Sequence, residues 1–246
     1  MKIVINIIRK FVAWVKSILV FLHSLGRQEI LVLGDSHCSF LKYAFLRGYN
    51  IKGHWFNVVS VKGATVSGIE NPNSVTQSSS IFRHALSISK ARYCVVLLGE
   101  VDVGFVLWYQ AQRYDKSIDI LLDEMILKYA SFIEDITASF EVICLSAPLP
   151  TIEDGDVIGE VANKRSEIMA TKKERTLLSR RFNLGMQHKC SDLPLVQYVN
   201  LDEASVGADG LVCEHLLSAN KFDHHYDKKK YMDLLFPELN NVLSEI

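Results

Sequence analysis

The sequence lacks any closely spaced pair of cysteines. Its five cysteines are scattered along the chain and odd in number: Cys38, Cys94, Cys144, Cys190 and Cys213. Without a C-x-x-C pair, the chain has neither the spacing of a zinc knuckle nor that of a disulfide framework. Cys94 and Cys144 lie inside apolar runs, where cysteine acts as a small core residue. This pattern fits a protein of the reducing cytoplasm.

The sequence also lacks an excess of charge of either sign. Lysine and arginine number 27, aspartate and glutamate number 28, and the formal net charge is -1. A nucleic-acid partner is therefore not expected, because such proteins carry basic patches that neutralise phosphates. The chain shows no internal repeat, low-complexity tract or linker after residue 27. We expect one domain over residues 28–246, preceded by a separate segment over residues 1–27.

The segment over residues 1–27 is strongly apolar, yet its basic residues recur every seven positions. Lys2, Arg9, Lys16 and His23 fall on one narrow stripe of a helix. A signal peptide is disfavoured, because no small-residue cleavage site is evident and Lys16 interrupts the apolar core. The charges also leave no uninterrupted run of the ~20 apolar residues that span a bilayer. We expect a helix in the membrane interface, apolar side down and basic stripe up, at the inner face of the membrane. The alternative is a helix docked on the protein itself or on a second copy.

Short apolar runs alternate with helical patterns along the rest of the chain. Five runs have the length and composition of buried strands: residues 30–34, 55–60, 93–98, 141–146 and 195–200. The helical patterns lie at residues 38–46, from 74 or 78 to about 90, 115–140, 164–188 and 227–235. Asp115 or Ser117 can cap the third of these helices, and Pro237 is expected to limit the last. The alternation predicts a three-layer α/β/α fold with a mostly parallel five-stranded sheet.

A serine lies where the first predicted strand ends, in Gly34-Asp35-Ser36-His37. At a strand–turn–helix junction, Ser36 exposes its hydroxyl to the crevice and its backbone N–H can help to hold an oxyanion. The alternative is that Asp35 or Ser36 only caps the next helix.

Histidines before the last helix can supply the base that this serine needs. In residues 222–227, a histidine can take the Ser36 proton, while Asp223 fixes the tautomer of that histidine. These side chains could instead bind a metal or be exposed, although no third and fourth ligand is evident nearby in the sequence.

Two more polar segments follow predicted strands. The loop over residues 61–74 is long for a connector, and its glycines allow a close backbone approach to a ligand. The segment over residues 99–102, Gly-Glu-Val-Asp, follows the third strand. In a parallel sheet these strand ends meet in one crevice, which gathers five positions: Ser36, Gly63, Gly68, Glu100 and Asp102.

These four segments, in this order, resemble the sequence blocks of the SGNH/GDSL hydrolase family over roughly Ile30 to Leu235. Residues 34–37 are similar to the first block, G-D-S, which carries the nucleophilic serine. The loop around Gly63 and Gly68 is similar to the second block, whose glycine N–H helps to form the oxyanion hole. Residues 99–102 are similar to the third block, usually G-x-N-D, and residues 222–225 to the last, usually D-x-x-H.

The resemblance implies a flavodoxin-like SGNH hydrolase fold. The second and third blocks also resemble those of a bacterial branch associated with capsule and O-antigen polysaccharide loci. The resemblance implies that Ser36 is the nucleophile, that His225 is the general base and then acid, and that Asp223 orients it. Backbone N–H groups of Ser36 and of Gly63 or Gly68 would hold the oxyanion.

Two departures from the family pattern bear on the chemistry. Val101 replaces the asparagine of the third block, and valine cannot donate to an oxyanion; ionised Glu100 only accepts. Losing one such donor costs on the order of 3 kcal/mol, unless Asn71 or Asn73 replaces it.

The second departure is a shorter last block. Asp223 lies two residues before His225 instead of three, which makes His224 an alternative base. His37, beside the nucleophile, is a candidate for substrate contact.

The resemblance therefore implies a serine esterase that removes O-acyl groups, expected to be acetyl, from a cell-surface polysaccharide. It implies a glycan or acylated sugar as substrate, and neither a cofactor nor a metal. One alternative is an O-acetyltransferase that uses the same residues on the same class of glycan. Another, which Val101 supports, is a non-catalytic protein that binds a glycan or a partner at the membrane through residues 1–25.

Overall fold

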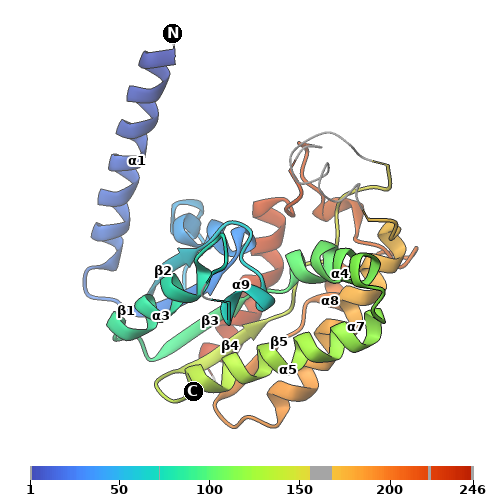
Figure 1. Ribbon diagram of the computed structural model, residues 1–246. Helices are drawn as coiled ribbons and strands as arrows, with labels where there is room; N and C mark the ends of the chain where they lie inside the picture. The colour runs from blue at the N-terminus through green and yellow to red at the C-terminus, as the bar shows by residue number, and fades with distance from the viewer. Residues whose placement is uncertain (1, 72, 156–167, 221–222, 245–246) are drawn as a thin grey trace.

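The computed structural model describes residues 2–71, 73–155, 168–220 and 223–244. Within these residues, five strands form one sheet in the order β2-β1-β3-β4-β5, and each neighbouring pair is parallel (Figure 1). The strands are β1 (Gln28–Gly34), β2 (His54–Ser60), β3 (Tyr93–Leu97), β4 (Glu141–Leu145) and β5 (Val196–Val199). The expected parallel five-stranded α/β fold is confirmed, and each strand lies within about two residues of its predicted bounds.

Helices cover both faces of this sheet and make the three predicted layers. The longer helices are α3 (Ser78–Ile88), α4 (Leu107–Tyr114), α5 (Ile118–Thr137), α7 (Lys172–Ser191) and α9 (Lys228–Ser244). The shorter ones are η1 (Ser36–Arg47), α2 (Val66–Ile69), η2 (Asp102–Val106), α8 (Asp202–Ser205) and η3 (Glu214–Leu216). Of the two predicted caps of α5, Asp115 and Ser117, Ser117 is the one observed: its side chain accepts from the Asp119 N–H. The pattern over residues 164–188 predicts a helix from Lys164, but residues 168–171 are not helical and α7 begins at Lys172; residues 164–167 lie outside the described residues.

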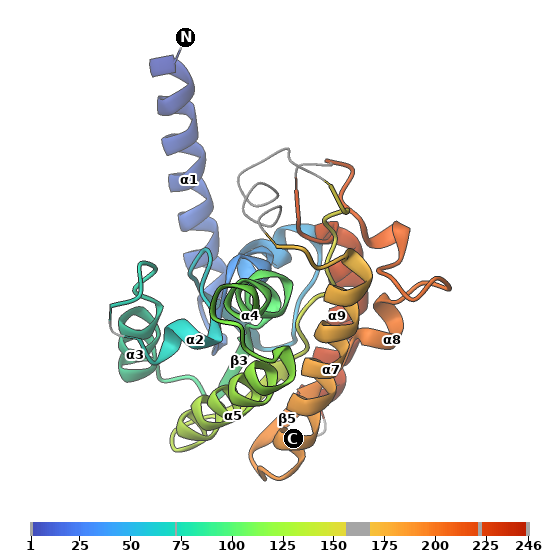
Figure 2. The same ribbon diagram turned by 45° about the vertical axis from the view of Figure 1, so that its right-hand side comes forward.

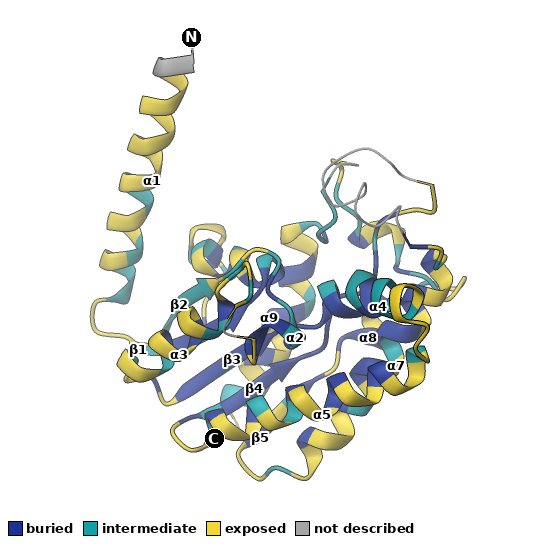
Figure 3. Cartoon of the chain, viewed as in Figure 1, coloured by how far each residue is buried: buried dark blue, intermediate teal, exposed yellow. Residues whose placement is uncertain are grey.

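The sheet separates two hydrophobic cores, because alternate side chains of a strand point to opposite faces. On β1, Leu31 and Leu33 pack into the core that α3, α5 and α7 cover, whereas Ile30 and Val32 pack into the core beneath η1 and α9. Figure 3 shows the central strands buried along their length. A polypeptide strand buried on both faces reads as a continuous apolar run, which is why these strands were predictable.

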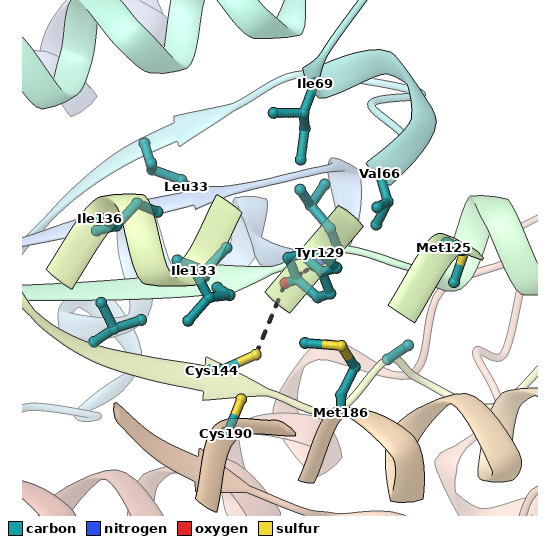
Figure 4. Close-up of a cluster of buried hydrophobic side chains, with 14 of the residues drawn as sticks. Leu33, Val66, Ile69, Met125, Tyr129, Ile133, Ile136, Cys144, Met186 and Cys190 are labelled. Carbon is teal, nitrogen blue, oxygen red and sulfur yellow. Dashed lines mark hydrogen bonds between the residues drawn. The ribbon is translucent and has the colours of Figure 1, made fainter. Parts of the chain in front are cut away.

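The first core is close-packed around a tyrosine. Tyr129 of α5 lies beside Cys144 of β4, with Met186 and Cys190 of α7 on the other side of the sulfur (Figure 4). Cys144 is fully buried, as its position inside an apolar run predicted.

Three other predictions about helices need correction. The pattern over residues 38–46 indicates an α-helix, but η1 has 3-10 geometry with a non-helical break at Tyr43. No element was expected over residues 103–114, where η2 and α4 form. The last helix does not stop before Pro237 but runs through it to Ser244.

Burial explains why α9 tolerates its internal proline. A proline inside a helix costs about 3 kcal/mol, because it removes one backbone hydrogen bond and crowds the preceding turn. Leu235, Phe236 and Leu239 around Pro237 are all buried, and each such side chain contributes about 1.5–3 kcal/mol. The Asn240 side chain also donates to the Phe236 carbonyl at 2.8 Å. The core contact therefore outweighs the local penalty.

The N-terminal segment is the helix α1 (Lys2–Ser24), and it projects away from the domain in both views (Figures 1 and 2). At its C-terminal end, the His23 ring stacks on Phe45 at 4.2 Å, and the Lys16 ammonium lies 5.1 Å above the Tyr43 ring. This part of the basic stripe therefore faces the domain, and large apolar side chains such as Phe11 are exposed. Across the described residues, no helix combines the length and apolarity that crossing a membrane requires.

Candidate active site

Ser36 lies at the sharp turn between β1 and η1. The preceding Gly34 has no room for a side chain, because a Cβ atom there would lie 2.5 Å from the Leu97 carbonyl oxygen of β3. Asp35 is 1% exposed, and its carboxylate accepts a hydrogen bond from the His37 backbone N–H at 2.7 Å. Asp35 therefore caps η1, which leaves the Ser36 hydroxyl to another partner.

That partner is His225, which lies 189 residues further along the chain. The Ser36 hydroxyl oxygen is 2.9 Å from Nε2 of His225. On the far side of the ring, Nδ1 lies 2.6 Å from Oδ1 of Asp223, and the same oxygen accepts the His225 backbone N–H at 3.1 Å. Because Nδ1–H donates to the carboxylate, Nε2 keeps a lone pair that can accept the serine proton. The two-residue spacing of Asp223 and His225 is thus compatible with a serine–histidine–aspartate chain.

Two further hydrogen bonds, beside those among Ser36, His225 and Asp223, hold the histidine segment in place. The Thr151 hydroxyl donates to the His224 carbonyl at 2.7 Å, and the Tyr226 hydroxyl accepts the Leu149 backbone N–H at 2.8 Å. Both bonds tie the segment to the loop that follows β4. The first residue of the predicted block, Phe222, lies outside the described residues.

The surroundings adjust the charge of both members of the pair. Burial lowers the pKa of His225 below its usual value, and neighbouring His37 adds to that effect, although Asp223 opposes it. For Asp223, partial burial alone would raise the pKa, but hydrogen bonds from the His225 ring and backbone outweigh it and hold the pKa low. At neutral pH, His225 is therefore neutral and Asp223 ionised, the states that a general base and its orienting carboxylate need.

His37 and His224 lie against the His225 ring. His37 is buried, and its Nδ1 lies 3.0 Å from Asp35 Oδ1 while its Nε2 lies 3.9 Å from Glu100 Oε2. Ring centroids are 4.5 Å apart for His37 and His225, and 4.0 Å apart for His224 and His225. The structure thus brings the predicted His37, His224 and Glu100 to the serine. Of the two adjacent histidines, His225 is the one that contacts Ser36.

Asp102 faces a different direction, toward the loop that follows β2. Its carboxylate accepts the Val66 backbone N–H at 2.8 Å and the Ser67 hydroxyl at 3.3 Å. Burial raises the pKa of Asp102 to about 7, although these hydrogen bonds oppose the shift. Asp102 therefore holds the start of α2 against η2.

The predicted oxyanion donors differ in how they are placed. Gly68 donates its N–H to Thr65 Oγ1 at 2.9 Å, the cap of α2, and Asn71 is exposed with its side-chain oxygen bound to the Asn73 N–H. Gly63 lies in a turn with φ +72°, a conformation that favours glycine. The loop is therefore bonded largely to itself.

A small cavity opens beside the serine. It has a volume of about 40 Å³, and its walls include Phe40, Tyr226, Lys228 and Tyr231. Phe40 and Lys228 were missed as site residues from the sequence. Phe40 lies in the helical pattern that directly follows Ser36, and this closeness in sequence is the signal that could have found it.

No family model matches the sequence, and no curated protein matches it. Solved structures do match, and they show an SGNH hydrolase-like fold. A Slackia heliotrinireducens protein provisionally described as an SGNH hydrolase aligns with a TM-score of 0.53 at 11% identity, over 88% of this chain and 99% of that chain.

Two esterase structures share the fold. The M. smegmatis aryl esterase aligns with a TM-score of 0.58 at 11% identity, over 89% of this chain and 100% of that one. A catalytic mutant of an acetylxylan esterase from Geobacillus stearothermophilus gives 0.54 at 13% identity, over 88% and 94%. At these identities, the likeness shows the fold, and the site geometry has to carry the function.

Proposed function

We propose that this chain is an SGNH-type serine esterase. The observation that carries the proposal is the continuous chain of hydrogen bonds from the Ser36 hydroxyl through His225 to Asp223. In this mechanism, Ser36 Oγ bonds to the acyl carbon while His225 Nε2 takes the serine proton. His225 then gives that proton to the departing alcohol, which leaves an acyl-enzyme. Water attacks the acyl-enzyme by the same route, releases the acid and restores Ser36.

We propose a short acyl group, with acetyl as the natural choice. The cavity beside Ser36 is about 40 Å³, and one water molecule needs about 10–15 Å³ on this measure. A group of the size of acetyl therefore fits in this cavity. Acetylxylan esterase, a structural neighbour, acts on an acetylated sugar polymer, which favours an O-acetylated glycan as the substrate class. We propose a cell-surface polysaccharide as the glycan because the second and third sequence blocks resemble those of the bacterial branch associated with capsule and O-antigen loci.

Two backbone N–H groups, those of Ser36 and Gly63, are the proposed oxyanion donors. Val101 has no donor side chain, and the Gly68 N–H is bonded to Thr65. One missing donor lowers kcat by about 10²–10³ in comparable sites. We therefore expect slow turnover compared with an esterase that has the asparagine.

The test compares hydrolysis of p-nitrophenyl acetate with that of the butyrate and octanoate esters. We expect the acetate ester to be hydrolysed fastest. Hydrolysis should be lost in Ser36→Ala and kept in the control Ser80→Ala, which changes an exposed serine of α3. Equal rates for all three esters would contradict the acetyl assignment. Acetyl transfer to a glycan hydroxyl, with little free acetate, would instead indicate the acetyltransferase. Hydrolysis unchanged in Ser36→Ala would favour the binding protein.

For the N-terminal helix, we propose attachment to an anionic membrane surface. Its sequence KIVINIIRKFVAWVKSILVFLHS contains no acidic residue, and large apolar side chains such as Ile7, Phe11 and Trp14 are about 60% exposed. A basic and apolar helix of this kind binds in the headgroup region, with about 1 kcal/mol from each basic residue near the surface. We expect sedimentation with vesicles that contain phosphatidylglycerol and less with pure phosphatidylcholine. Unchanged sedimentation of a Phe11→Glu/Trp14→Glu protein would contradict the attachment.

A further inference from the structure

Three histidines from two distant parts of the chain meet beside the Ser36 hydroxyl. His37 belongs to η1, whereas His224 and His225 precede α9. One ring nitrogen from each lies within 4.8 Å of the others. The grouping is a product of the fold, since 187 residues separate His37 from His224 in the sequence.

Two of these histidines already have the partners that metal-binding histidines use. A ligating imidazole usually donates its second ring N–H to a carboxylate, which fixes the ring and increases its basicity. His37 Nδ1 lies 3.0 Å from the Asp35 carboxylate, and His225 Nδ1 lies 2.6 Å from the Asp223 carboxylate. With Nδ1 of each ring turned to its carboxylate, Nε2 is the nitrogen that can ligate a metal; it lies 2.9 Å from Ser36 Oγ in His225 and 3.9 Å from Glu100 Oε2 in His37. Two carboxylate–histidine pairs thus converge on one point.

Glu100 places a carboxylate next to the same point. Its Oε2 lies 3.9 Å from His37 Nε2, and its side chain is 2% exposed. Imidazole nitrogens with one carboxylate oxygen are a common tetrahedral ligand set for Zn²⁺.

The three histidine nitrogens need to move only a little closer together to bind one metal ion. Nitrogen ligands around tetrahedral Zn²⁺ lie roughly 3.3 Å apart, because each bond is about 2.0–2.1 Å long. The histidine nitrogens lie within 4.8 Å of one another, so movements of about 1.5 Å close the site. His224 and His225 are only partly buried in a loop, and rotation of their side chains can supply this movement.

We propose that His37, His224 and His225 form an inhibitory metal site, which binds one divalent ion of the Zn²⁺ class. The metal takes the Nε2 lone pair of His225, the same lone pair that accepts the Ser36 proton. Metal binding and general-base catalysis therefore exclude each other at this nitrogen. The inhibition depends on the proposed esterase function, whereas the metal binding does not.

The first experiment measures Zn²⁺ binding directly, by calorimetry on full-length protein stripped with a chelator. We expect one ion per chain in the wild type and in Ser36→Ala, because the serine is not a ligand. Affinity should fall by at least roughly tenfold in His37→Asn and in His224→Asn, and stay unchanged in His84→Asn, an exposed histidine of α3. Circular dichroism confirms that each variant is folded; His224, which is partly exposed, gives the safer substitution.

The second experiment follows labelling of Ser36 by a fluorophosphonate, with and without equimolar Zn²⁺. We expect Zn²⁺ to suppress labelling at least tenfold in the wild type, and a chelator to restore it. Absence of binding, or binding that His37→Asn and His224→Asn leave unchanged, would overturn the metal site. Stoichiometric binding without suppression of labelling would overturn its inhibitory role. Failure of the esterase proposal looks different: Ser36 stays unlabelled in chelator, while Ser36→Ala still binds Zn²⁺.

Discussion

The Ser36 side of the site and the loop after β2 are built differently. On the η1–α9 side, Ser36, His225 and Asp223 bond to one another across the gap between distant segments. The polar groups of the loop after β2 bond instead to that loop and to η2: the Gly68 N–H donates to Thr65 Oγ1, and Asp102 accepts the Val66 N–H. The residues Ser36, His225 and Asp223 are arranged to move a proton, whereas the loop after β2 has few groups left to stabilise a developing charge. The comparison predicts an enzyme with a competent nucleophile and a weak oxyanion hole.

The largest expected effect comes from a substitution of Asp223, which holds His225 in place. Asp223→Asn removes the acceptor that holds the His225 tautomer, so Nε2 no longer presents a lone pair to Ser36. We expect kcat for an acetyl ester to fall about 10⁴-fold, with KM little changed. Steady-state kinetics measure this, with Asp115→Asn, an exposed residue in the left-handed region, as the matched control. A loss below tenfold would mean that Asp223 does not orient the base.

The next prediction concerns Val101, where a substitution is expected to increase activity. Val101→Asn returns an amide donor to the third block, and we expect kcat to rise about 10²-fold. Val101→Leu is the control, because leucine has nearly the shape of asparagine but no donor. If the asparagine variant gains no more than the leucine variant, the oxyanion hole is already complete without this position.

The pH profile tests the arrangement of Ser36, His225 and Asp223 without a mutation. His225 must be neutral to accept the Ser36 proton, and burial with His37 lowers its pKa below the usual 6.5. Activity should therefore persist at pH 6.5 and be lost only as the pH falls through the lower pKa of the folded protein. A half-maximal point for kcat/KM above pH 6.5 would contradict this.

The smallest effect concerns Asp102 and the loop that it holds. Its pKa is raised from 3.8 to about 7 by burial. The folded state therefore favours the protonated carboxyl, and this contribution to stability is complete below pH 3.8 and lost as the pH rises through 7. We expect Asp102→Asn to flatten the pH dependence of Tm between pH 4 and 8. Parallel curves for the two proteins would show that Asp102 does not titrate in this range.

The sheet was predictable for local reasons, and the serine–histidine–aspartate chain was expected from the resemblance of short sequence blocks. A strand buried on both faces must be apolar along its length, so the runs that include Ile30 to Leu33 and Tyr93 to Leu97 stand out. The glycine before Ser36 and the short spacing of Asp223 and His225 are also features of neighbouring residues. Short-range patterns of this kind remain visible in the sequence.

The features that the sequence did not predict depend on contacts that form only after folding. The π-helix η2 (Asp102–Val106) and the meeting of Ser36 and His37 with His225 depend on how distant segments pack. Pro237 misled the prediction, because the penalty of proline is local whereas the burial that offsets it is tertiary. The start of α7 is different: Thr171 and Glu174 form a capping box that the sequence does display.

The most direct test of the account is fluorophosphonate labelling, followed by intact mass and peptide mapping. The probe bonds to a serine that a neighbouring base has activated, so no substrate needs to be known. We predict one adduct per chain, on Ser36, that disappears in Ser36→Ala and in His225→Ala. No adduct on chelator-treated protein, or an adduct on another residue, would contradict the assignment of Ser36 as the nucleophile.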